Sequence, residues 1–233
     1  MAVSTGRDPD VINVVVLGVI AWTLAFISFR KLLPNRSFEF CNRLVSTLHA
    51  CLAVTLASIS VQNWRCPICP LASQASPFQM QTLAVTCSYL IYDMVCCHFD
   101  KKVNVDNAIH HLVCIVGIAA GFAYQKCGSE MVAALWITEI SSPFLHLREI
   151  LKEIGYRGTD LNLAADIGFA VIFSFGRMVG GPYLTYMTLS ATGVPLLIKA
   201  MALGLQLVSA YWFYKIVRMV RFKLNNRSTS KNS

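Results

Sequence analysis

Two adjacent histidines are the residues of this chain best suited to chemistry. His110 and His111 close the segment Asp106-Asn-Ala-Ile-His-His111. A neutral imidazole can serve as a general base or as an acyl acceptor near neutral pH. On one helix the two rings point about 100° apart. We therefore expect one ring to face a cavity and the other to contact a neighbouring helix or hold the substrate. The alternative is that both only tie helices together through buried hydrogen bonds.

Acidic residues near this pair could fix the tautomer of the imidazoles. Asp93 is the leading partner, because it lies inside an apolar segment and at the same expected depth as the pair. Asp106 is the second candidate, since it precedes His110 by one helical turn. The predicted catalytic residues are His110, His111 and Asp93.

Further polar side chains inside apolar segments could bind a substrate. Ionisable groups at membrane depth are unfavourable in lipid, so they indicate function by default. Glu139 and His146 lie on one stripe of a helix, and Arg177 has the depth needed for a buried ion pair with Glu139. The alternative is that this ion pair only fixes the register of two helices. The predicted substrate-binding residues are Tyr92, Asp106, Glu139, His146 and Arg177, and no metal site is predicted.

These residues must be positioned by helices in a membrane. The chain is 55% hydrophobic and 14% charged, with a mean hydropathy of +0.55. Soluble domains are nearer 45–50% apolar and about 25% charged. The apolar residues form continuous blocks near the ~20 residues that a membrane-spanning helix needs. The sequence therefore predicts an all-α, polytopic membrane protein with no room for a soluble domain.

We expect about seven transmembrane helices, the fifth of them kinked at Pro143. Their predicted ranges are 11–29, 41–61, 78–97, 107–124, 131–147, 163–183 and 195–217. The chain then divides into a lumenal N-terminus with the first helix (1–35), a helical domain (36–223) and a cytosolic polar tail (224–233).

Lysine and arginine residues are concentrated in alternate connections of this arrangement, which predicts its orientation. The C-terminus and the histidines are expected on the cytosolic side, and the N-terminus in the lumen. The formal net charge of +8 reflects this asymmetry along one membrane face. It does not indicate binding to nucleic acid, because the cations are not clustered with exposed aromatic residues.

Three cysteines fall in connections assigned to the oxidising side. Cys66 and Cys69 have the spacing of a redox or zinc pair, but no second pair or loop histidine completes a metal site. A structural disulfide from Cys127 to one of them is the favoured interpretation.

The polar motifs also resemble a known family. Ser88-Tyr-Leu-Ile-Tyr-Asp93, the segment ending in His110 and His111, and Glu139-Ile-Ser-Ser-Pro-Phe144 with Arg148 are similar to motifs of the TLC domain. That domain is shared by TRAM, the Lag-type ceramide synthases and a lipofuscinosis-linked protein. The resemblance covers roughly residues 36–223, and the short TLC-domain-containing proteins are the nearest likeness.

The resemblance implies a barrel made of the second to seventh helices around a lipid-sized cavity, with the first helix outside. It also implies an endoplasmic-reticulum location. In the ceramide synthases the paired histidines act on acyl-CoA, which makes acyl-CoA the expected co-substrate here, without a bound cofactor. The stretch Thr138-Glu-Ile-Ser-Ser142 lacks the second His-Asp element of those enzymes, and their homeobox-like insert is missing. Both departures argue against ceramide synthesis itself.

The expected function is membrane lipid homeostasis, either through acyl-CoA-dependent sphingolipid or phospholipid acyl transfer by the histidine pair or as a non-enzymatic regulator of lipid composition. Lipid homeostasis is favoured over a committed enzyme. The alternative is a non-enzymatic seven-helix lipid transporter, cargo receptor or regulatory scaffold. The expected partners are membrane lipids and a second copy of the chain in a homo-oligomer, with no nucleic acid.

Overall fold

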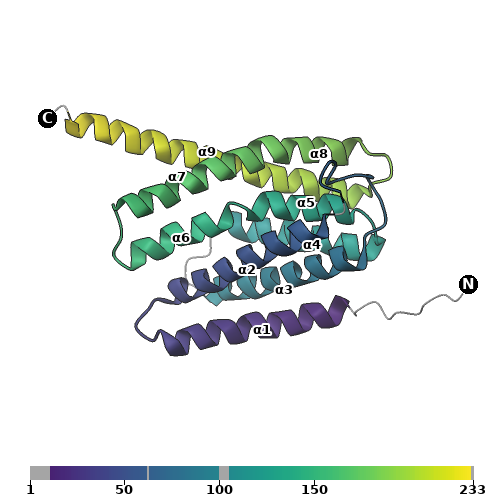
Figure 1. Ribbon diagram of the computed structural model, residues 1–233, viewed down its shortest axis with the longest axis horizontal. Coiled ribbons are helices and arrows are strands. Elements are labelled where there is room, and N and C mark those ends of the chain that lie inside the picture. The colour runs from purple at the N-terminus through teal and green to yellow at the C-terminus, as the bar shows by residue number, and fades with distance from the viewer. Residues whose placement is uncertain (1–10, 62, 100–104, 232–233) are drawn as a thin grey trace, which may run out of the picture.

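The computed structural model describes residues 11–61, 63–99 and 105–231 (Figure 1). Side chains are not described for 97–99, 219–220 and 222–231. The predicted lumenal segment before Val11 lies outside the described residues, as do Lys101 and Lys102 of the third connection and the side chain of His98.

The described part of the chain is built from helices, which confirms the predicted fold class. They are α1 (Val11–Leu32), α2 (Phe38–Ser60), α3 (Pro77–Phe99), α4 (Val105–Tyr124), α5 (Gly128–Glu139), α6 (Ser142–Glu153), α7 (Asp160–Phe175), the π-helical turn η1 (Gly176–Gly180), α8 (Gly181–Ser190) and α9 (Leu196–Lys231). Because α5 and α6 form one interrupted pass and α7, η1 and α8 form another, the chain makes the seven passes that the sequence predicts. The predicted polar tail continues α9 instead of leaving it.

Five of these passes are long and apolar enough to cross a membrane. Within the described residues they are Val11–Leu32, Phe38–Ser60, Val105–Tyr124, Asp160–Ser190 and Leu196–Arg218. In the remaining two passes, α5 and α6 have only 12 residues each, and α3 carries the buried polar side chains of Gln79, Thr82 and Thr86. Both passes contact α2. The chain is therefore a multi-pass integral membrane protein.

Six passes close into a ring. Going around it, α2 packs on α3, α3 on α4, α4 on α9, α9 on α8, α8 on α5, and α5 with α6 on α2 again. The first helix lies outside this ring against α3 and α2, with no buried residue of its own (Figure 1). A side chain at Gly18 would collide with the hydroxyl of Ser88, so glycine is what lets α1 approach α3 closely.

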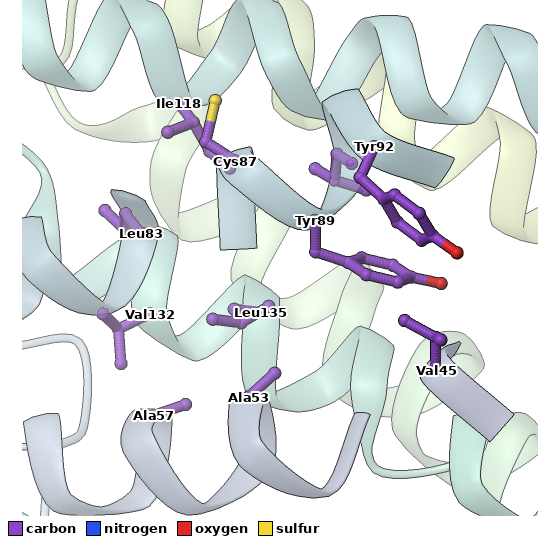
Figure 2. Close-up of a cluster of buried hydrophobic side chains, with 11 residues drawn as sticks. Val45, Ala53, Ala57, Leu83, Cys87, Tyr89, Tyr92, Ile118, Val132 and Leu135 are labelled. Atoms are coloured by element: carbon purple, nitrogen blue, oxygen red, sulfur yellow. The ribbon is translucent and has the colours of Figure 1, made fainter. Parts of the chain in front are cut away.

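The core of the barrel fixes one face of α3. In Figure 2, Leu83 of α3 lies beside Val132 and Leu135 of α5 and near Ala53 and Ala57 of α2. Further along α3 the phenol rings of Tyr89 and Tyr92 extend to the same side, toward Val45 (Figure 2). This packing holds the last turns of α3, which carry Asp93, against the first turns of α2.

The fifth pass breaks between α5 and α6, as Pro143 predicts. Pro143 lies in the first turn of α6, where its missing N–H leaves no hydrogen bond unmade. The break at Ile140 and Ser141 starts a second short helix that runs on to Glu153, beyond the predicted end at residue 147.

Candidate functional site

The barrel contains two neighbouring cavities that share part of their lining. The larger, of about 830 Å³, lies where α3 ends and α4 begins, and we call it the polar chamber. The smaller, of about 130 Å³, is lined mostly by apolar side chains of α3, α4, α5, α8 and α9, and we call it the apolar chamber. Four residues line both cavities and define the neck: Leu90, His110, Glu139 and Arg177. Together the two chambers offer a polar end and an apolar end, which suits an amphipathic ligand.

A chain of contacts from α2 and α3 orients His111. His111 Nε2 lies 3.4 Å from Asp93 Oδ2, and both side chains are buried. Asn42 Nδ2 donates to Asp93 Oδ1 at 2.8 Å, and the hydroxyl of Tyr92 donates to Asn42 Oδ1 at 2.8 Å. Asp93 thus favours the tautomer with the proton on Nε2. The other ring nitrogen, Nδ1, is buried and has no hydrogen-bond partner among the described residues, so its lone pair is unpaired in this tautomer.

This contact confirms that Asp93 and the histidine pair lie at one depth. Tyr92, by contrast, is buried and is not part of the lining of either chamber, because its hydroxyl is directed at Asn42. The structure therefore gives it a supporting position in place of the predicted contact with substrate. Asn42 was missed, since an amide close to the end of a predicted helix reads as an ordinary interfacial residue.

His110 lies in the neck with different neighbours. Its ring centroid is 4.9 Å from that of Trp212 in α9, and its Nδ1 is 3.8 Å from the sulfur of Cys114. Both histidines line the polar chamber, with ring centroids 5.6 Å apart. His110, the second ring, therefore both contacts a neighbouring helix through Trp212 and lines the chamber, so the structure is consistent with either of the two roles expected for it.

Asp106 does not pair with His110. Its Oδ2 accepts hydrogen bonds from Trp212 Nε1 at 2.7 Å and from Lys215 Nζ at 3.1 Å. The expected local partnership one turn away is therefore wrong, because the indole and ammonium donors of α9 occupy the carboxylate. Asp106 lines the polar chamber and joins α4 to α9 beside His110.

Arg177 enters the neck from the π-helical turn η1. Its Nη2 donates to the carbonyl of Thr138 at 2.6 Å, and its guanidinium lies over the rings of Phe173 and Trp212, at 5.1 and 5.3 Å from their centroids. Its Nε and Nη1 have no hydrogen-bond partner among the described residues. π-Helical turns of this kind often occur at functional sites. Glu139 faces the same neck, but no ion pair joins the two side chains in the described structure, contrary to expectation.

The polar chamber carries two more histidines and two basic side chains. His146 lines it with Nδ1 3.4 Å from Arg43 Nη1. His49, which was not among the predicted site residues, stacks on Tyr89 with ring centroids 3.7 Å apart. Lys215 lines the chamber and is half exposed. Within the ranges that the structure describes, no three His, Cys, Asp or Glu side chains gather as a metal site would require.

The disulfide differs from the predicted one. Cys66 is bonded to Cys69, and Cys127 is a free, buried thiol. The two sites belong to different clusters: Cys66 packs near Ile68 and Leu184, whereas Cys127 packs with Val194 and Ile198. The predicted bond to Cys127 is therefore wrong, because separate parts of the barrel end hold the two sites.

Comparison with known proteins agrees with this architecture. The family model of the TLC domain matches residues 39–218. TLC domain-containing protein 4-B of Danio rerio is 28% identical over 209 residues, which cover 82% of this chain and 76% of that protein. TLC domain-containing protein 4 C of Dictyostelium discoideum is 23% identical over 210 residues, covering 82% and 74%.

A third similar protein comes from a virus. The putative TLC domain-containing protein L438 of Acanthamoeba polyphaga mimivirus is 26% identical over 152 residues, which cover 61% of this chain and 73% of that protein. The family match includes the residues of the neck and the histidine pair. It also includes Tyr92, Asn42 and Asp93, whose contacts lead to His111. This chain belongs to the TLC domain family.

Proposed function

We propose that this protein transfers an acyl group from acyl-CoA to a membrane sphingolipid or phospholipid, and thereby acts in membrane lipid homeostasis. The observation that carries the proposal is His111, which Asp93 orients and which lines a polar chamber that shares four lining residues with an apolar chamber.

The geometry suggests a role for each part of the cavity. An acyl chain in the apolar chamber would bring the thioester carbonyl into the neck. The free N–H groups of Arg177 can donate there to the carbonyl oxygen as negative charge develops on it. His111 can then take the proton of the acceptor lipid or accept the acyl group itself. Arg43 and Lys215 line the polar chamber where the phosphates of CoA would lie.

We also propose the orientation and location of the protein. The polar chamber would open to the cytosol, where acyl-CoA is available, with the N-terminus in the lumen of the endoplasmic reticulum. Two features support this orientation: the basic residues in alternate connections, and the disulfide of Cys66 and Cys69 at the opposite end of the barrel from the polar chamber.

Reconstitution tests the proposed activity. Full-length protein in liposomes that contain lysophospholipid and a sphingoid base, supplied with radiolabelled palmitoyl-CoA, is expected to form labelled lipid and free CoA in equal amounts. Mass spectrometry identifies which acceptor is acylated. Labelled acyl-CoA or lipid that binds without turnover would contradict acyl transfer and favour the non-enzymatic alternative.

Thiol labelling tests the orientation. In sealed microsomes, Cys66→Ala should make Cys69 reactive to a membrane-impermeant maleimide only after the membrane is permeabilised. Cys127 should stay unlabelled in folded protein, because burial and the neighbouring Glu130 carboxylate raise the pKa of its thiol to about 11 and maleimides react with the thiolate. Labelling of Cys69 in intact, cytosol-side-out vesicles would reverse the proposed orientation.

A further inference from the structure

An acidic residue, Glu130, lines the far end of the apolar chamber. The lining of this chamber runs from the neck to a far end formed by five residues: Leu83, Ile118, Glu130, Thr188 and Ile198. On α5, Glu130 precedes Glu139 of the neck by nine residues, which corresponds to roughly 13 Å along the helix. Glu130 therefore lies at the end of the chamber opposite the reactive histidine.

One oxygen of the Glu130 carboxyl group has a structural role. Glu130 is 3% exposed, and its Oε1 accepts a hydrogen bond from the backbone N–H of Ala72 at 2.6 Å. This bond ties the connection between α2 and α3 to the first turn of α5. The position also suits a carboxylate, since the free N–H groups at a helix N-terminus favour negative charge.

The second carboxyl oxygen of Glu130 does not take part in this contact. Glu130 Oε2 is buried and has no hydrogen-bond partner among the described residues. The tie to Ala72 needs only Oε1, and a glutamine carbonyl would make it equally well. Glu130 lines the apolar chamber, and an unpaired, buried carboxylate oxygen on such a residue is unfavourable unless a ligand supplies a donor. Thr188 at the same end does not supply it, because its hydroxyl donates to the carbonyl of Leu184.

We propose that the apolar chamber binds an acyl chain that carries a hydroxyl group at its far end, and that Glu130 Oε2 pairs with this hydroxyl. A hydroxyl both donates and accepts, so it satisfies Glu130 whether the carboxyl group is ionised or protonated. The rest of the wall stays apolar and fits the methylene chain. This inference rests on the proposed function, since the chain must enter from the neck with its reactive end near His111.

Competition binding tests the proposal. The full-length protein in lipid nanodiscs is loaded with a tritiated fatty acid. Terminally hydroxylated acids and unsubstituted acids of the same carbon number then compete with it over a series of chain lengths. At the best length, the hydroxylated acid should compete at about a tenfold lower concentration, equivalent to about one hydrogen bond.

Variants test whether the preference for the hydroxylated acid depends on Glu130. Glu130→Leu should lose or reverse it while still binding the unsubstituted acid. Glu130→Gln keeps an acceptor for Ala72 and should retain a reduced preference, so a folding defect in the leucine variant does not decide the test. Glu153→Gln removes a carboxyl group that is exposed and bonded to Ser37, and it should keep the wild-type preference.

The possible failures are distinguishable. Equal competition by the two acids at every length in the wild-type protein would overturn the role of Glu130 and leave the proposed function standing. A preference that survives in Glu130→Leu would also overturn it. If neither acid competes, the chamber does not take acyl chains, and the proposed function fails with the inference.

Discussion

Replacing His111 by alanine should reduce acyl transfer by about 10²–10⁴-fold, the usual contribution of a positioned general base. The reason is that His111, among the histidines whose side chains the structure describes, combines a contact with Asp93 that fixes its tautomer, an unpaired ring nitrogen and a position in the lining of the polar chamber. The measurement is the initial rate of lipid acylation in the reconstituted system, normalised to folded protein by thermal melting in detergent.

Variants of the residues that support His111 should lose less activity the more remote their contact with His111 is. Asp93→Asn keeps the shape and removes the charge, so an intermediate loss of the maximal rate is expected. Asn42→Ala should lose less, because it removes one of the hydrogen bonds to Asp93 and leaves the contact with His111. Both variants should change the pH profile of the rate, whereas a purely structural role would change only abundance. A His111→Ala protein that melts normally and retains the wild-type rate would reduce the pair to a packing element.

The sequence predicted most of the architecture because lipid constrains it strongly. Only helices and closed β-barrels satisfy their backbone groups in a bilayer. The apolar blocks of this chain are continuous, as helices require, and they identified all seven passes. The ends were less predictable. Polar residues such as Asp160 and Thr159, whose side chain caps α7, extend the helices beyond the apolar block. The π-helical turn at Arg177 had no visible signal, since periodicity alone does not reveal one inserted residue.

A contact in the site was predictable where it depends on the depth of two residues in the membrane. It was unpredictable where it depends on which neighbouring element a side chain packs against. Asp93 and His111 meet because each lies six residues, nearly two turns, from the same end of neighbouring helices. Asp106 was misplaced because its true donors, Trp212 and Lys215, are more than a hundred residues away in sequence. Cys127 was misplaced for a similar reason: loop position gives the compartment of a cysteine but not the surface against which it packs.

Arg177→Met should have the second large effect, a loss of about 10²–10³ in the maximal rate, as expected when a donor to a developing oxyanion is removed. Arg177→Lys should recover only part of this loss. An ammonium restores the charge but not the planar arrangement of N–H groups, in which Nη2 binds the Thr138 carbonyl while Nε and Nη1 have no partner among the described residues.

Stability must be separated from chemistry in this variant, because Arg177 is buried close to Glu139 in the neck. Removing the guanidinium leaves that carboxyl group without a nearby cation, which is unfavourable in a buried site. Arg177→Met should therefore also lower abundance, and the double variant Arg177→Met/Glu139→Gln should restore abundance. If the rate stays low in the restored protein, Arg177 acts on the substrate. If the rate returns with abundance, Arg177 is only the counter-charge of Glu139, and the carbonyl of the acyl donor must find its hydrogen-bond donors elsewhere in the neck.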